Sequence, residues 1–264
     1  MRVLSLRLLG VFGAYDARDD RPIPISGRKM RMLLAYLAMQ RGAEVPRETL
    51  ADLFWGNNTD DLARQSLRQA LVGLRRTLAP VAPEALSVRR DSVSLRDALV
   101  SVDAVDFAER AERQDLACAA ALYRGEFLTG FGLESAPIAD WVQAQRNRYA
   151  SLAATVFQLL AERYEAAGEG KLAIAHAERL VEIDGFREDW QRVLLRLYAR
   201  YLGRQRALSH ARKLTGFMRR ELDVDPEAAT LELLDGIRRG AWQMTASALH
   251  SGQDHRAPTL DPDV

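Results

Sequence analysis

The chain contains few of the cysteine and histidine residues that form disulfides and metal sites in other proteins. Its 264 residues include one cysteine, Cys118, and four histidines. A single thiol excludes an internal disulfide framework and a cysteine-rich zinc site. Cys118 lies in the alanine-rich run LACAAALY, where we expect a buried structural thiol. Arg7 interrupts the apolar N-terminal segment, no signal-peptide cleavage pattern follows, and the uncharged run from Leu8 to Tyr15 is too short to span a bilayer. We therefore expect a cytoplasmic protein.

Motifs that carry catalysis or hold cofactors are also missing. The sequence contains no G-x-G-x-x-G, no G-x-S-x-G and no His-x-x-x-His ligand pair. Gly-Glu-Gly-Lys at 168–171 lacks the phosphate-loop spacing and follows a helical pattern, so we interpret it as an inter-helix turn. The acidic pairs Asp60-Asp61 and Glu188-Asp189 fall at expected helix starts, where they complement the helix dipole. We predict no enzyme activity, no cofactor and no metal.

The charges that are present are unevenly distributed. Hydrophobic residues make up 48% of the chain and charged residues 28%, as in ordinary globular proteins. Residues 1–100 hold 16 Lys and Arg against 11 Asp and Glu, a net +5, whereas residues 101–264 hold a net −4. A basic front part and a mildly acidic back part suggest different partners for each.

The first 98 residues predict a small α+β domain. Short alternating segments precede three segments of helical spacing, and a second pair of alternating segments follows. Ser26 is a plausible N-cap for the first helix, and Gly42 would end it. We expect strands over 2–9, 11–15 and 23–25 in an antiparallel sheet, helices over 28–40, 47–55 and 59–80, and a hairpin over 86–96 that turns at Arg90-Asp91-Ser92. This order is that of a winged helix, a helix-turn-helix variant with an added strand pair.

The third helix has an apolar face and a basic face. At about 100° per residue, Leu67, Leu71, Leu74 and Leu78 share one arc, while Arg64, Arg68 and Arg75 share a neighbouring arc that Gln65, Gln69 and Arg76 extend. Guanidinium and amide groups suit phosphates and base edges. A solvated amphipathic helix remains the alternative, but its position in a winged helix favours DNA recognition. We expect Arg89 and Arg90 at the hairpin tip, with Arg28 and Lys29 at the start of the first helix, to contact phosphates.

The back part predicts an all-α domain over 101–244, followed by a disordered tail over 245–264. A repeat with a period of 34 residues pairs Tyr164 with Tyr198, Ala173 with Ala207, Ala177 with Ala211, Leu180 with Leu214 and His176 with His210. That period is typical of tetratricopeptide helix pairs, which stack and leave a groove for a partner. We interpret the two histidines as repeated helix-surface positions. The predicted fold is therefore an α+β winged-helix domain followed by an all-α tetratricopeptide-like helical domain.

Several segments resemble a known family. ISGRKMRMLLAYLAMQRGAEVPRETLADLFWG, followed by ARQSLRQALVGLRRTL, resembles the DNA-binding domain of Streptomyces antibiotic regulatory proteins. VDAVDFAERAE, LYRGEFLTGF, DWVQAQRNRYASLA and RRELDVDPEAAT resemble the bacterial transcriptional activation domain. The resemblance covers roughly residues 3–240. It implies an OmpR-like winged helix and a transcriptional activator that binds promoter direct repeats as side-by-side protomers, a homodimer on DNA. It also implies recruitment of RNA polymerase holoenzyme, control of a secondary-metabolite or similar pathway, and a nucleoid-associated location.

When the elements of the family are placed on this sequence, the resemblance implies a recognition helix over residues 64–78 and a wing over residues 86–96. The loop before this helix can face polymerase in the OmpR-like arrangement, so Asn57, Asn58, Asp60 and Asp61 are candidate activation contacts, with a plain helix-capping loop as the alternative.

The chain departs from the family pattern at two places. Val45-Pro46 stands where a Ser cap is expected, and Val72-Gly73 replaces a Ser and a longer polar residue. A helix-interior Gly costs about 1 kcal/mol relative to Ala, and we expect Gly73 to remove a possible groove contact and alter the target sequence.

Two other functions stay open. The chain could be the N-terminal fragment of a larger multidomain signalling regulator. Alternatively, it could be a tetratricopeptide-like protein-interaction module with a non-activating winged helix.

Overall fold

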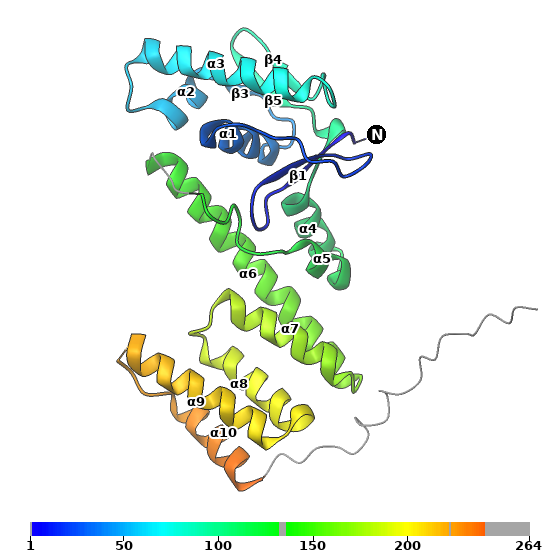
Figure 1. The fold of residues 1–264 in the computed structure, drawn as a ribbon, viewed down its shortest axis with the longest axis vertical. Helices are drawn as coiled ribbons and strands as arrows, with labels where there is room; N and C mark the ends of the chain where they lie inside the picture. Colours follow the sequence, from blue (N-terminus) through cyan, green and yellow to red (C-terminus); the bar gives the residue numbers. More distant parts are fainter. Residues whose placement is uncertain (1, 132–135, 222, 241–264) are drawn as a thin grey trace, which may run out of the picture. The chain divides into compact units, whose positions relative to one another are not determined.

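The structure of the protein is a computed structural model that describes residues 2–131, 136–221 and 223–240 (Figure 1). The chain divides into two compact units, Met1–Val156 and Phe157–Val264. The predicted domain limits, 1–98 and 101–244, stay predictions, and the tail over 245–264 lies outside the described residues. In the described part of the chain, no helix is both long and apolar enough to cross a membrane.

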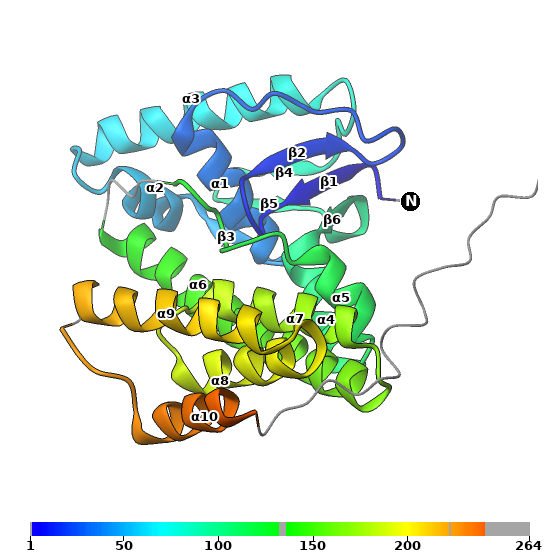
Figure 2. The same ribbon diagram turned by 60° about the horizontal axis from the view of Figure 1, so that its bottom comes forward.

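The first unit begins with a three-stranded sheet of order β2-β1-β6 (Figure 2). β1 (Leu4–Arg7) and β2 (Gly13–Asp16) are antiparallel, whereas β6 (Val100–Val102) runs parallel to β1. The predicted strand over 23–25 is wrong, because only an isolated bridge between Tyr15 and Pro22 forms there. β6 was not predicted, since three residues are too few to show a period.

Three helices follow, and their order agrees with the prediction. They are α1 (Arg28–Met39), α2 (Arg47–Trp55) and α3 (Asp60–Leu78). Ser26 as the N-cap of α1 is wrong: Gly27, with φ 84°, occupies that position and no side chain caps the helix. α1 ends before Arg41 and Gly42, which both have positive φ, a backbone conformation that closes helices.

The hairpin forms a second sheet, of order β3-β5-β4. β4 (Leu86–Val88) and β5 (Ser92–Leu95) are antiparallel, with Leu86 opposite Leu95 and Val88 opposite Val93. The unusual Val45-Pro46 pair forms β3 and places Val45 opposite Val93. A residue before proline is pushed toward extended backbone, so this pair replaces the expected cap with a strand. A short 3-10 turn, η1 (Asp97–Leu99), then leads into β6.

The winged helix is joined covalently and by hydrogen bonds to the helices that follow it. These are α4 (Asp103–Glu112), α5 (Leu116–Leu122) and α6 (Ala136–Ala166). The buried Asp103 carboxylate accepts hydrogen bonds from the Leu8 amide at 2.6 Å and the Leu9 amide at 3.3 Å. The Arg124 guanidinium donates to it at 3.2 Å. Asp103 therefore ties the end of β1 to the segment after α5.

Aromatic side chains continue this connection through the first unit. Tyr36 of α1 packs edge-on against Phe54 of α2, with ring centres 6.0 Å apart, and against Trp141 of α6 at 5.0 Å. Trp141 in turn lies 5.7 Å from Phe127. Because α1 and α2 share this cluster with α6, the winged helix and the start of the helical region form one packed body.

The second unit is built from stacked helices. They are α7 (Gly170–Ile183), α8 (Glu188–Leu197), the π-turn η2 (Tyr198–Leu202), α9 (Arg204–Glu221) and α10 (Ala228–Arg239). Small side chains at repeated positions allow the close packing: Ala173, Ala177 and Ala207 are fully buried, and Ala211 nearly so. The 34-residue sequence repeat therefore corresponds to equivalent core positions.

Two predictions about polar side chains in the helices are wrong. Cys118 is exposed rather than buried, because α5 buries Leu116 and Ala119 instead. His176 and His210 are half-buried rather than on the helix surface. His176 stacks on Tyr164 with ring centres 5.4 Å apart, and His210 Nε2 lies 2.8 Å from Gln191 Oε1. Burial lowers the pKa of both imidazoles.

Candidate nucleic-acid interface

The sequence of α3 explains why it forms a long, amphipathic helix. Asp60 and Asp61 lie in its first turn, and Arg75 and Arg76 in its last, which matches the direction of the helix dipole. Its apolar arc is buried against α1 and α2. The buried side chains are Ala63, Leu67, Ala70, Leu71, Leu74 and Leu78.

The opposite arc of α3 is exposed and basic. All six predicted recognition residues are exposed: Arg64, Gln65, Arg68, Gln69, Arg75 and Arg76. Val72, which is 63% exposed, lies near the middle of this arc at about 100° per residue. An apolar side chain thus stands among cationic and amide groups, a feature that the hydrophobic spacing of the buried face does not indicate.

Gly73 does not lie on this exposed arc. A Cβ atom at Gly73 would lie 2.8 Å from the Sδ of Met30 in α1, closer than carbon and sulfur atoms normally approach. The expectation that Gly73 removes a groove contact is therefore wrong. The glycine instead allows α1 and α3 to pack closely, which offsets its unfavourable helix propensity.

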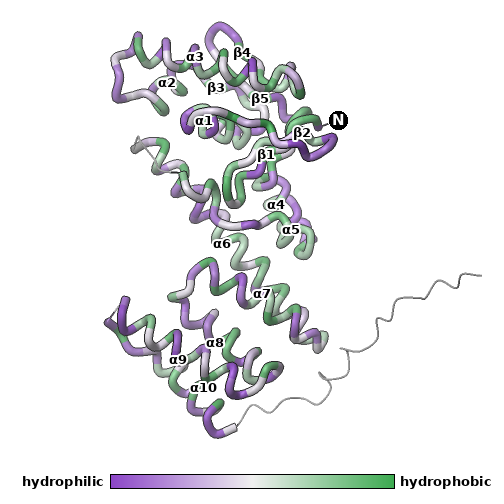
Figure 3. The backbone as a smooth tube through the Cα atoms, viewed as in Figure 1, coloured by the Kyte–Doolittle hydropathy of each residue, from purple (hydrophilic) through white to green (hydrophobic). Residues whose placement is uncertain are grey.

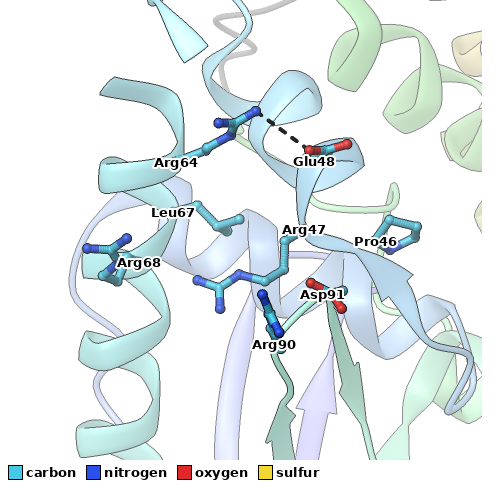
Figure 4. A pocket seen from close by; sticks show the side chains of 8 residues that line it. All are labelled: Pro46, Arg47, Glu48, Arg64, Leu67, Arg68, Arg90 and Asp91. Atoms are coloured by element: carbon cyan, nitrogen blue, oxygen red, sulfur yellow. Dashed lines mark ion pairs between the residues drawn. The ribbon is translucent and has the colours of Figure 1, made fainter. Parts of the chain in front are cut away.

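A hollow of about 520 Å³ lies between α3, the start of α2 and the hairpin tip (Figure 4). In this view Arg47 and Arg90 come together below Leu67, while Arg68 points away from the other side chains (Figure 4). Arg64 Nη2 lies 3.6 Å from Glu48 Oε1. The lining comprises Pro46, Arg47, Glu48, Arg64, Leu67, Arg68, Arg90 and Asp91. Arg47 was missed from the sequence, where it is only the first residue of a predicted helix.

The structure separates the four residues that we expected to contact phosphates. Arg90 lines the hollow, whereas Arg89 forms an ion pair with Glu44, whose carboxylate also accepts a hydrogen bond from Ser92. Neighbouring residues near a hairpin turn point to opposite sides. Arg28 is exposed at the start of α1. Lys29 Nζ lies 5.4 Å from the centre of the Trp55 ring, so its charge already stabilises the packing of α1 against α2.

The loop between α2 and α3 is polar and exposed (Figure 3). Asn57 and Asn58 form its turn, and the Asn58 amide donates to the Trp55 carbonyl at 2.9 Å. Asp60 and Asp61 are exposed at the start of α3. Leu62, 54% exposed, adds an apolar side chain to the same end of α3, and sequence reasoning did not identify it.

Comparison with known proteins identifies the family. A family model described as the bacterial transcriptional activator domain matches residues 92–238. The chain belongs to this family. With its winged helix, it is a regulator of the Streptomyces antibiotic regulatory protein type, as the sequence resemblance predicted.

A solved structure shares the fold. It is that of Mycobacterium tuberculosis EmbR in complex with a low-affinity phosphopeptide, with a TM-score of 0.59 and 23% sequence identity over 90% of this chain. This likeness confirms the predicted fold class, a winged helix followed by a tetratricopeptide-like helical domain. The chain spans 66% of the length of that protein. Comparison with curated proteins gave no match.

Proposed function

We propose that this activator binds double-stranded promoter DNA with α3 in the major groove. The observation that carries the proposal is the exposed arc of α3. Arg68, Arg75 and Arg76 have no ion-pair partner within the described residues, although the same unit holds many exposed carboxylates. A row of cations without internal partners, on a helix whose other face is fully packed, suits a polyanion.

The side chains of this arc match what the major groove offers. A helix fits that groove, an arginine can bind guanine with two hydrogen bonds, and a glutamine can bind adenine in the same way. Val72 is the apolar contact suited to a thymine methyl group. Arg47 and Arg90, in the hollow beside α3, are placed to contact the phosphates that fix the position of the helix.

The test of this function is a gel-shift measurement with a site selected from random duplex DNA. Arg68→Ala or Arg75→Ala should each cost about 1–3 kcal/mol of binding free energy and relax the base preference. Arg90→Ala should weaken binding to all duplexes alike and reduce the salt slope by about one. Arg113→Ala, which removes an exposed guanidinium at the end of α4, is the matched control. Unchanged binding by both α3 variants would refute the groove assignment.

Activation of transcription also requires contacts between the DNA-bound protein and its protein partners. We propose that protomers bind direct repeats side by side, and that the loop with Asn57, Asn58, Asp60 and Asp61 contacts RNA polymerase holoenzyme. The exposure of these four side chains supports this contact. Asp60→Asn with Asp61→Asn should then lower transcription in vitro without lowering DNA affinity. A parallel loss of both would indicate that the carboxylates act only by capping α3.

The regulated genes are proposed to belong to a secondary-metabolite or similar pathway. Because the chain spans 66% of the length of a structurally similar protein, the same pair of domains also fits a role as the front part of a longer signalling regulator. A protein-interaction module with a non-activating winged helix predicts no transcription from a selected site in the polymerase assay, whatever the DNA affinity.

A further inference from the structure

The second unit contains a hollow that is remote in sequence from the winged helix. It has a volume of about 640 Å³ and lies between α9, α8 and the turn that joins α7 to α8. Gln191 and His210 are among its lining residues, together with Arg212, Lys213, Phe217 and Arg220. Its size is within the range of ligand sites.

The floor of this hollow is held by hydrogen bonds. Gln191 is 5% exposed, its Oε1 lies 2.8 Å from His210 Nε2, and its Nε2 donates to the Gly185 carbonyl at 2.8 Å. These bonds join α8, α9 and the α7–α8 turn at one point. The hollow is therefore a fixed feature of the packing, not a gap between loosely placed side chains.

The rim of the hollow is cationic. Arg212, Lys213 and Arg220 line it, and no carboxylate is among its described lining residues. None of these three side chains has an ion-pair partner within the described part of the chain, whereas the nearby Arg219 pairs with Asp225. Residues 101–264 carry a net −4, so a cluster of unpaired cations is not a consequence of composition. It favours an anionic ligand.

One wall of the hollow is apolar. Phe217 stacks on Phe186 with ring centres 4.9 Å apart, and Phe186 remains 44% exposed. Gly216 lies beside Phe217, and a Cβ atom placed there would meet nothing within 4 Å. The helix thus leaves room for a side chain from a partner next to this partly exposed aromatic pair.

We propose that this hollow is a docking site for an acidic protein segment that also carries aliphatic or aromatic side chains. The spacing of the cations favours a peptide over a small anion. From Arg212 to Arg220, α9 rises by about 12 Å, the length of roughly four extended residues, so acidic side chains along one segment can reach both ends of the rim. The apolar side chains between them would pack on Phe186 and Phe217. This site is independent of the DNA-binding proposal.

The test uses the full chain and a fluorescein-labelled peptide of alternating Glu and Leu with a central Phe. Fluorescence anisotropy should show binding of this peptide, but not of peptides with Lys in place of Glu or Ser in place of Leu and Phe. Combining Arg212→Gln, Lys213→Gln and Arg220→Gln should weaken binding roughly tenfold or more. The matched control combines Arg163→Gln, Arg196→Gln and Arg204→Gln, three exposed residues of the same unit, and should bind like the wild type.

A second pair of variants tests the hollow itself. Gly216→Leu should fill the space beside Phe217 and abolish peptide binding, whereas Gly216→Ala should keep it. Both variants replace a glycine inside α9, and both should retain the helical content of the chain. Equal binding by the two variants would overturn the proposal, as would binding of the Lys peptide or the absence of any effect of the triple Gln change.

Duplex DNA is measured in parallel. If the triple Gln variant loses affinity for DNA and the acidic peptide does not bind, the cations serve DNA and the docking proposal is wrong. Loss of DNA binding on substitution of α3, with peptide binding intact, would bear only on the winged helix.

Discussion

The contact between Gly73 of α3 and Met30 of α1 predicts an unusual response to a small substitution. In an unconstrained helix interior, Gly→Ala stabilises a protein by about 1 kcal/mol. At Gly73 the new methyl group would lie 2.8 Å from the Met30 sulfur, and overpacking of this kind costs about 1–3 kcal/mol. Met30 is half-buried and flexible, so the cost should fall at the lower end. Gly73→Ala should therefore be neutral or destabilise the chain by up to about 1 kcal/mol.

Removing the Met30 sulfur should reverse the sign of the change in stability that Gly73→Ala causes. In a Met30→Ala background, Gly73→Ala should stabilise the chain by about 1 kcal/mol, a coupling of about 1–2 kcal/mol between the two positions. Urea unfolding of the four proteins measures this coupling, with hydrogen exchange of the α3 amides to assign the transition to the first unit. If Gly73→Ala stabilised both backgrounds equally, the close approach of α1 and α3 would not explain this glycine. DNA affinity should stay unchanged, because Gly73 lies off the exposed arc.

Three further predictions concern other parts of the first unit. If Val72 contacts a thymine methyl group, replacing that thymine by uracil in the DNA site should weaken binding roughly fourfold, about 0.8 kcal/mol. The Val72→Ser variant should bind the thymine and uracil sites with equal affinity. Equal affinity of the wild-type protein for the two sites would exclude the contact. Asp103→Ala leaves the Leu8 and Leu9 amides unpaired and should cost about 3 kcal/mol of unfolding free energy; a loss below about 1 kcal/mol in urea unfolding would contradict its role as a tie. Hydrogen bonds from Arg18 lower the pKa of Asp16 from 3.8 to about 2. Because this pKa is depressed, the stabilisation exists above pH 3.8 and disappears as the pH falls toward 2, so the difference in stability between wild type and Asp16→Asn should shrink over that range.

The elements with a clear local pattern were predicted closely. α2 begins and ends at the predicted residues, and the hairpin pairs Val88 with Val93 as its alternation implied. The buried and exposed arcs of α3 also follow the spacing of its leucines and arginines. In each case the hydrophobic period lies within one segment, so the sequence alone shows which side chains face inward.

The predictions failed where an element depends on residues distant in sequence, or where the hydrophobic pattern of a helix is too uniform to show its buried face. β6 exists because Val102 pairs with Leu6, and three residues carry no period of their own. Cys118 was assigned to the interior because an alanine-rich helix has no strong apolar arc to identify its buried face. Arg89 and Arg90 are equivalent in sequence, but only the fold places Glu44 beside Arg89 and leaves Arg90 in the hollow.

Periodicity and motif spacing are local properties, and they were enough to predict the order of α1, α2, α3 and the hairpin, the buried arc of α3 and the family of the chain. The residues that each face contacts depend instead on tertiary packing. This packing places Met30 against Gly73, Arg47 beside Arg90, and three cations without ion-pair partners around a hollow in the second unit. These arrangements arise from the packing of segments far apart in the chain, which local periodicity does not encode.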